Sequence, residues 1–140
     1  MRKFFLVFLI ALGFCIHSIA AFGATTAPEV ATEAAEAWLA LADKGDAQAT
    51  WHQAAGAFKT GIEQKDWEKT LPKARQPLGE VTSRKLQSSE TTATLPGVAD
   101  GEYAIFRFQT SFANKKGASE ALLMQKEADG VWRAVGYFIK

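Results

Sequence analysis

Hydrophobic residues recur at helical spacing in the first half of the chain and alternate with polar residues in the second half. Between Pro28 and Gly45, apolar side chains fall three or four positions apart, which predicts one amphipathic helix. From Gly79 onward they alternate, as in strands with one face buried. Helices followed by strands indicate an α+β fold. The apolar stripe expected of the first helix consists of Val30, Ala34, Ala37, Trp38 and Leu41.

Two further helices are predicted before the strands begin. Asp46 is a suitable N-cap for the second helix, because its carboxylate can accept hydrogen bonds from the first turn. The third begins near Glu63 and contains Pro72, which lacks a backbone N–H and crowds the preceding turn. We expect a kink or a restart at this proline.

Four strands are predicted over residues 80–89, 102–112, 119–128 and 131–139. In the second, three phenylalanines point one way and polar residues the other. We therefore expect three N-terminal helices packed on a four-stranded antiparallel β-meander. The Phe row should meet the helical stripe that bears Trp38 and Trp51. The row consists of Phe106, Phe108 and Phe112.

Two connections between these strands are informative. Asp129-Gly130 is the strongest signal for a two-residue hairpin, and it would place Met124 opposite Val135. The segment 89–101 is too long for a tight turn, so we expect a hairpin extension or a flap over the open end of the sheet.

The first residues have the pattern of a secretory leader. Arg2 and Lys3 precede 13 apolar residues, and small residues follow. Cleavage is expected after Ala20 or Gly23. We take residues 1–23 as signal peptide and 24–140 as one domain, periplasmic or secreted, without a stable membrane anchor after cleavage.

Removal of the leader changes the composition in two ways. Cys15 is lost, which excludes thiol catalysis and cysteine-based metal sites in the mature protein. Of the 16 basic residues 14 remain, against 15 acidic ones, so no excess positive charge attracts nucleic acid. We expect no cofactor.

Few residues of the mature chain are suited to chemistry. His52 is its only histidine, and Asp46 or Asp66 could pair with it in a hydrolase or isomerase. If the concave side of the sheet is open, Arg84 and Arg107 could hold a carboxylate or phosphate in two-pronged fashion. Trp51 could line the same pocket, although aromatic residues at helical spacing are usually part of the core.

Several short motifs resemble the bacterial domain-of-unknown-function family 4019. They include Gly45-Asp46, Leu95-Pro96-Gly97 and Gly101-Glu102-Tyr103, and they extend over roughly residues 30–140. The resemblance implies an exported bacterial protein of similar layout and carries no catalytic residues with it. More distantly, the order of elements looks like the cone-shaped, cystatin-like domains typified by nuclear transport factor two, which often hold a pocket between helices and sheet.

These observations favour a non-catalytic binding or protein-interaction module of the bacterial envelope. Its partner would be a small molecule or another envelope protein. A small periplasmic enzyme using His52 and a carboxylate remains an alternative, as does a structural envelope protein.

Overall fold

The computed structural model describes residues 26–140, which form a helical half followed by a sheet. The leader and its cleavage site lie outside the described residues. The helices are α1 (Glu29–Asp43), α2 (Ala47–His52), α3 (Gly56–Gly61), α4 (Gln64–Arg75) and the short 3₁₀ helix η1 (Gln76–Leu78). None of the helices within residues 26–140 is long and apolar enough to cross a membrane.

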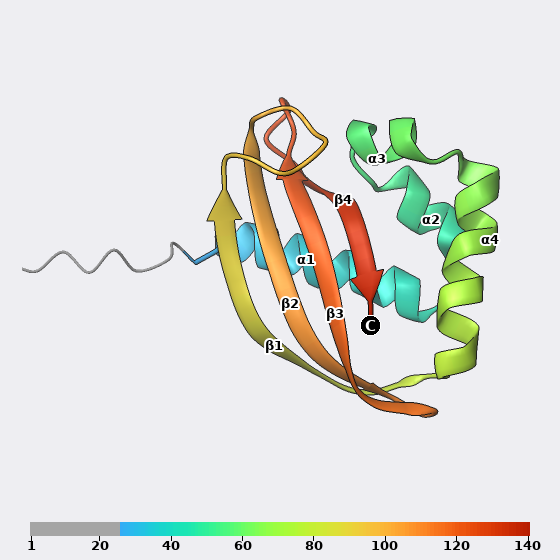
Figure 1. Ribbon diagram of the computed structural model, residues 1–140. Coiled ribbons are helices and arrows are strands. Elements are labelled where there is room, and N and C mark those ends of the chain that lie inside the picture. Colours follow the sequence, from blue (N-terminus) through green and yellow to red (C-terminus); the bar gives the residue numbers. More distant parts are fainter. Residues whose placement is uncertain (1–25) are drawn as a thin grey trace, which may run out of the picture.

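The sheet is an antiparallel meander, as predicted. Its strands are β1 (Val81–Thr92), β2 (Glu102–Phe112), β3 (Lys115–Lys126) and β4 (Trp132–Ile139), and they lie side by side in chain order (Figure 1). β1 and β4 therefore form the two edges. The expected α+β class is confirmed.

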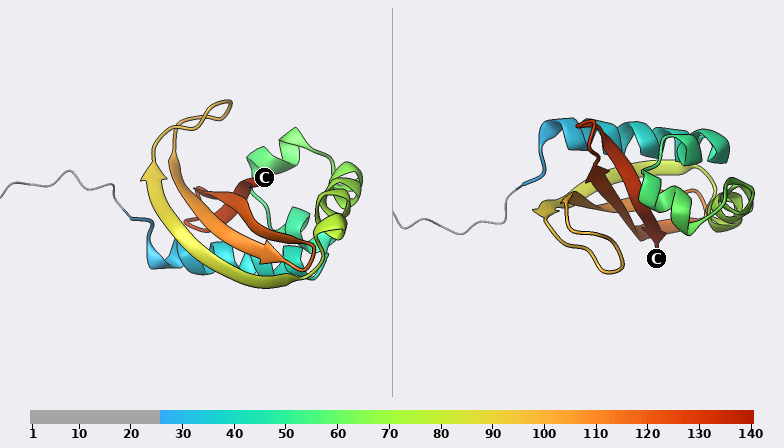
Figure 2. Two further views of the ribbon diagram at one scale, coloured as in Figure 1. Left: turned by 60° about the horizontal axis from the view of Figure 1, so that its bottom comes forward. Right: turned by 90° about the horizontal axis from the view of Figure 1, so that it is seen from above.

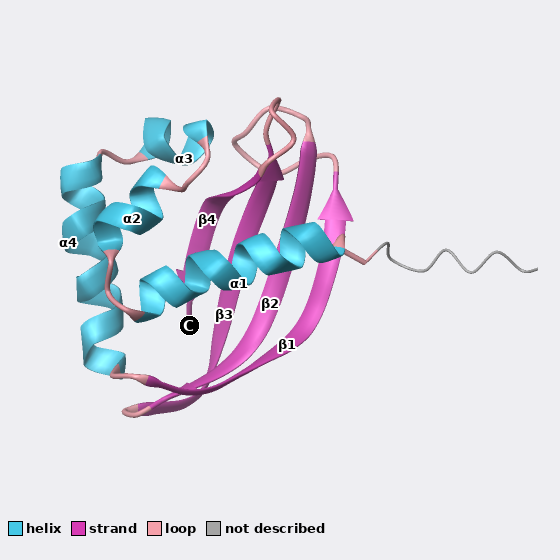
Figure 3. Ribbon diagram, turned by 180° about the vertical axis from the view of Figure 1, so that it is seen from behind, coloured by secondary structure: helices cyan, strands magenta, loops and turns pink. Residues whose placement is uncertain are grey.

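Helix α1 crosses one face of the sheet, passing over all four strands (Figure 3). Seen from above, α1 and the loop over residues 93–101 lie on opposite sides of the sheet (Figure 2). We call these sides the helix face and the open face. Helices α2, α3 and α4 lie beyond the β4 edge (Figure 1).

The buried side of α1 differs from the predicted stripe by one position. Val30 is 64% exposed, whereas the residue after it is fully buried. Small side chains let the helix approach the pleated sheet closely, so alanines define its inner face. The buried residues are Ala31, Ala35, Trp38, Leu39 and Ala42.

The core joins this face of α1 to the Phe row of β2. Phe106 and Phe108 are buried with Trp38, as predicted, and Trp51 packs at the margin of this core. The Trp38 ring lies 6.4 Å from that of Trp67 on α4. Both indole N–H groups donate to the fully buried Thr50 on α2, one to its carbonyl oxygen at 3.0 Å and the other to its hydroxyl at 2.9 Å. Thr50 therefore links α1, α2 and α4.

The second predicted helix is divided into two short ones. Residues between α2 and α3 leave the helical conformation to meet the outer edge of β4, where the Ala55 N–H donates to the Ala134 carbonyl at 2.8 Å. A backbone group that pairs with a strand cannot also continue a helix, so the helical stretch breaks here.

Of the kink or restart expected at Pro72, the restart is wrong. Helix α4 continues through Pro72 to Arg75 without interruption. The carbonyl that the missing N–H would have paired with belongs to Glu68, an exposed residue, and water can satisfy it there. Tertiary packing of Trp67 and Leu71, both buried, outweighs the loss of one hydrogen bond.

The hairpin between β3 and β4 is longer than predicted. The Glu127 N–H donates to the Val131 carbonyl at 3.0 Å, so the turn spans more than the two residues Asp129-Gly130. The longer turn pairs Lys126 with Trp132 and therefore places Met124 opposite Ala134 rather than Val135. Val135 is the extra residue at the register shift that follows, and beyond this bulge Leu123 faces Gly136.

Replacing Phe108 by Ala tests which face of the sheet carries the core. Phe108 is 4% exposed, and we expect Phe108→Ala to lower the free energy of unfolding by about 3–5 kcal/mol in a urea titration. Phe138 on the open face is 57% exposed and provides the control, with an expected loss below about 1 kcal/mol. Equal losses would contradict this assignment of the faces.

Candidate functional site

Charged and hydroxyl side chains from six elements meet on the helix face, near the ends of α1 and α4. We call them the buried charge cluster. Asp43 is the last residue of α1 and Arg75 the last of α4, while the sheet supplies the rest. The members are Asp43, Arg75, Arg84, Thr110, Glu120 and Tyr137.

Glu120 is the centre of this cluster, with no solvent exposure. Its Oε1 accepts hydrogen bonds from Arg84 Nε at 2.7 Å and from Thr110 Oγ1 at 2.9 Å, and the Tyr137 hydroxyl donates to its Oε2. Antiparallel pairing puts these residues on four neighbouring strands with their side chains on one face. A buried carboxylate needs several donors, and the sheet register provides them.

Asp43 connects the two arginines. Arg84 donates from Nη1 and Nη2 to the two Asp43 oxygens, each at 2.8 Å, which is a bidentate pair. Arg75 Nη2 donates to the same carboxylate at 2.6 Å, while its Nη1 donates to the Tyr137 hydroxyl at 2.8 Å. The Arg75 guanidinium also lies 5.1 Å from the centre of the Phe112 ring. Nε of Arg75 is buried and has no hydrogen-bond partner among residues 26–140.

The cluster contains two cationic and two carboxylate side chains, so its formal charges cancel. Burial by itself would raise the pKa of Asp43, but hydrogen bonds from Arg84 and Arg75 outweigh it and hold that pKa below its ordinary value. Burial and the neighbouring Glu120 charge raise the pKa of Tyr137, which stays protonated at neutral pH. With its charges already paired, the cluster is suited to holding the elements together.

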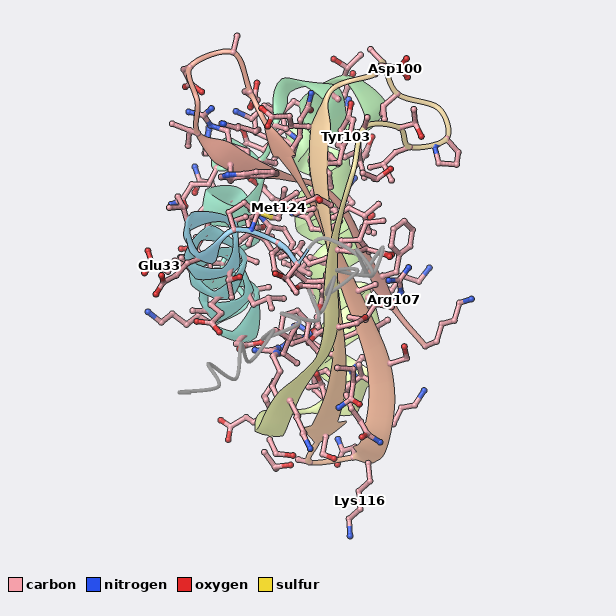
Figure 4. All side chains as sticks on the ribbon, turned by 90° about the vertical axis from the view of Figure 1, so that its left-hand side faces the viewer. Glu33, Asp100, Tyr103, Arg107, Lys116 and Met124 are labelled. Carbon is pink, nitrogen blue, oxygen red and sulfur yellow. The ribbon has the colours of Figure 1, made fainter. Side chains whose placement is uncertain are left out.

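The two predicted ligand-binding arginines lie on opposite faces of the sheet. Arg84 belongs to the buried charge cluster. Arg107 lies on the open face, away from Glu33 on α1, and pairs with Glu90 at 2.6 Å (Figure 4). The sheet separates them, so they do not form one two-pronged site. Binding of a ligand by either stays a prediction.

Trp51 and His52 lie at the end of α2, apart from both arginines. The Trp51 indole N–H donates to the Ile62 carbonyl at 2.9 Å, and Lys59 Nζ lies 5.3 Å from the centre of its ring. The exposed His52 ring meets Trp51 edge-on at 5.4 Å. Within residues 26–140, no hydrogen bond or ion pair joins the His52 ring to a carboxylate, and no group of metal-ligating residues gathers.

A second candidate site lies at the open end of the sheet, in a hollow of about 400 Å³ that we call the flap pocket. The loop over residues 93–101 forms one side of it. The Gly101 N–H donates to the Ala93 carbonyl at 2.9 Å, and the Tyr103 hydroxyl donates to the Ala99 carbonyl. The first bond joins the two ends of the loop, and the second holds its C-terminal part to β2. The lining residues are Thr26, Pro28, Thr91, Thr92, Ala93, Gly101, Glu102, Tyr103 and Trp132.

Trp132 distinguishes this pocket from the other hollows. Its side chain is largely buried, yet its indole N–H has no hydrogen-bond acceptor among residues 26–140. The indole N–H groups of the other three tryptophans, Trp38, Trp51 and Trp67, each have an acceptor. The sequence places Trp132 on a strand and could not show which of the four tryptophans would line a pocket, because the residues around Trp132 come from three other segments of the chain.

Comparison with known proteins gives one match. A family model described as "Protein of unknown function (DUF4019)" matches residues 34–137. No curated protein and no solved structure matches the chain. The distant likeness to nuclear transport factor two therefore stays an expectation.

Removing the charge of Glu120 should destabilise the fold strongly. Glu120→Gln leaves the arginines with one carboxylate fewer in a buried setting, and we expect a loss of about 3 kcal/mol or more in the free energy of unfolding. Glu90→Gln, which breaks the exposed pair with Arg107, is the control with an expected loss of about 0–1 kcal/mol. A loss below about 1 kcal/mol for Glu120→Gln would contradict the role of the cluster.

Acid should remove the contribution of Asp43. Because its pKa is lower in the folded state than in the unfolded state, that contribution is complete well above about pH 4 and disappears as the pH falls below it. The free energies of unfolding of the wild type and of Asp43→Asn, measured by urea titration, should differ most near neutral pH and converge toward about pH 3. A difference that stays constant with pH would be the contrary result.

Proposed function

The chain belongs to the DUF4019 family, and we propose that this member is a non-catalytic module of the bacterial envelope that binds a small molecule in the flap pocket. Export to the periplasm is part of the proposal and rests on the pattern of residues 1–23. The observation that carries the binding function is Trp132, which lines the hollow and whose indole N–H has no acceptor among the described residues.

The pocket has the chemistry of a binding site. Largely buried Tyr103 and Trp132 contribute apolar surface, and threonines at positions 26, 91 and 92 contribute hydroxyl groups. Binding pockets of this kind combine mostly apolar walls with a few polar groups that orient the ligand. An acceptor oxygen on a ligand would satisfy the Trp132 donor, which has no acceptor among residues 26–140.

The charges at the pocket limit the class of ligand. Glu102 is the one ionisable carboxylate among the lining residues, and Lys126 Nζ lies 3.4 Å from it. Among the described residues no arginine or lysine lines the pocket, so none of them would compensate the charge of an anionic ligand there. We therefore propose a neutral molecule with hydroxyl or carbonyl oxygens.

The catalytic alternative has less support. General acid–base catalysis needs a titratable group held by a second one in a cleft. His52 is exposed, and the buried carboxylates are engaged by arginines and hydroxyls. A turnover lost in His52→Ala without loss of folding would establish the enzyme instead.

Nuclear magnetic resonance of the indole N–H groups tests the proposal directly. The protein from Ala24 to Lys140, labelled with ¹⁵N, is titrated with neutral fractions of a periplasmic small-molecule extract, and the Trp132 signal is identified by its absence in Trp132→Phe. We expect one fraction to shift this signal. Trp132→Phe keeps an aromatic side chain but removes the N–H donor, so binding should weaken by about two- to tenfold.

Trp51→Phe is the matched control, because its indole N–H bonds to Ile62 outside the pocket. This variant should bind the active fraction with unchanged affinity. The proposal fails if no fraction shifts the Trp132 signal, or if both variants weaken binding equally.

A further inference from the structure

The two edges of the sheet differ in how they are covered. At β4, the Ala55 N–H occupies the Ala134 carbonyl, which closes part of the outer edge. At β1, the pairing involves only β2, and no segment within residues 26–140 pairs with its other side. β1 is 12 residues long, and Leu86 near its middle is 40% exposed. A long open edge offers a row of unpaired backbone groups to another strand.

We propose that two copies of this chain associate by antiparallel pairing of their β1 strands about a two-fold axis between Gln87 and Ser88, with Lys85 of each copy opposite Glu90 of the other. This inference is independent of the flap pocket. It joins the two four-stranded sheets into one continuous sheet.

The bulge in β1 makes this register possible. Five positions apart on a regular strand, Lys85 and Glu90 would point to opposite faces. Gln87 is the extra residue in the pairing with β2, because Leu86 faces Phe108 and Ser88 faces Arg107. Lys85 and Glu90 consequently both lie on the open face, opposite Gln109 and Ile105.

In the same register, the other residues that lie opposite one another in the two β1 strands also point to the same face of the sheet. Arg84 meets Thr91 on the helix face, and Ser83 meets Thr92 on the open face. Leu86 of one copy lies opposite Ser89 of the other, whose hydroxyl accepts a hydrogen bond from the Ala27 N–H at 3.4 Å. The exposed Leu86 side chain thereby gains apolar cover beside Ala27.

Charge complementarity selects a second copy of this chain as the occupant. Side chains directly opposite one another in an antiparallel pair lie about 5 Å apart, and opposite charges there stabilise the pair. Two-fold symmetry produces the Lys85–Glu90 contact twice. Glu90 also accepts from Arg107 at 2.6 Å, which holds its carboxylate on the open face. An unrelated strand without this spacing of charges would place no opposite charge beside Lys85.

The symmetry also limits the assembly to two copies. A β1–β1 interface uses the same surface on both copies and closes on itself. Growth into a fibre would need β1 to pair with β4, where Ala54 and Ala55 already lie against the strand.

The proposal is tested by measuring the dissociation constant of the dimer in charge-reversal variants by sedimentation equilibrium. The protein from Ala24 to Lys140 should show a monomer–dimer equilibrium between about 1 and about 200 µM, weakened by added salt. Lys85→Glu and Glu90→Lys, each alone, place like charges opposite each other twice and should raise the dissociation constant about tenfold or more. The two substitutions together restore opposite charges and should return it to within about threefold of the wild type.

Lys116→Glu is the control, since Lys116 lies at the far end of the sheet in the β2–β3 hairpin (Figure 4). It should leave the dissociation constant unchanged, and circular dichroism should show all four variants folded. A monomer throughout this concentration range overturns the proposal. A dimer that the single reversals do not weaken, or that the double reversal does not restore, overturns the register and with it the β1 interface.

Discussion

A carboxylate without solvent exposure must be surrounded by donors and positive charge, and Glu120 imposes this requirement on the whole domain. It lies on β3, on the face that also carries the apolar core. The requirement is met from both sides, by Arg84 on the edge strand and Tyr137 on the last strand. Because Arg84 and Arg75 also hold Asp43, the same interaction fixes the ends of α1 and α4 against the sheet.

This arrangement separates the interior from the surfaces available for recognition. The strongest polar groups of the helix face are engaged with one another, and their formal charges cancel. What remains lies at the margins: within the described part of the chain, the Trp132 donor at the flap pocket has no acceptor and β1 has an unpaired edge. A module with a firmly held centre and such margins is suited to binding, because little ordering is needed before a ligand or a second copy can dock.

The sequence allowed prediction of the α+β class, the meander and the buried Phe row, since alternation and helical spacing are local signals. It could not show that Ala54 and Ala55 would leave the helix, because the cause is a contact with Ala134 some 80 residues away. The buried charge cluster has the same origin: Arg84 was recognised as a residue of interest, but its partners Asp43 and Glu120 come from distant segments. The bulges in β1 and β4 likewise depend on the neighbouring strands.

A double-mutant cycle between Arg84 and Glu120 measures the organising interaction most directly. Arg84→Leu, Glu120→Leu and the double variant are compared with the wild type by the free energy of unfolding in urea. If the pair organises the domain, each single change leaves a charge unpaired, and the double variant should lose at least about 1.5 kcal/mol less than the sum of the two. Losses that add to within about 0.5 kcal/mol would show that the two side chains act independently and would contradict this account.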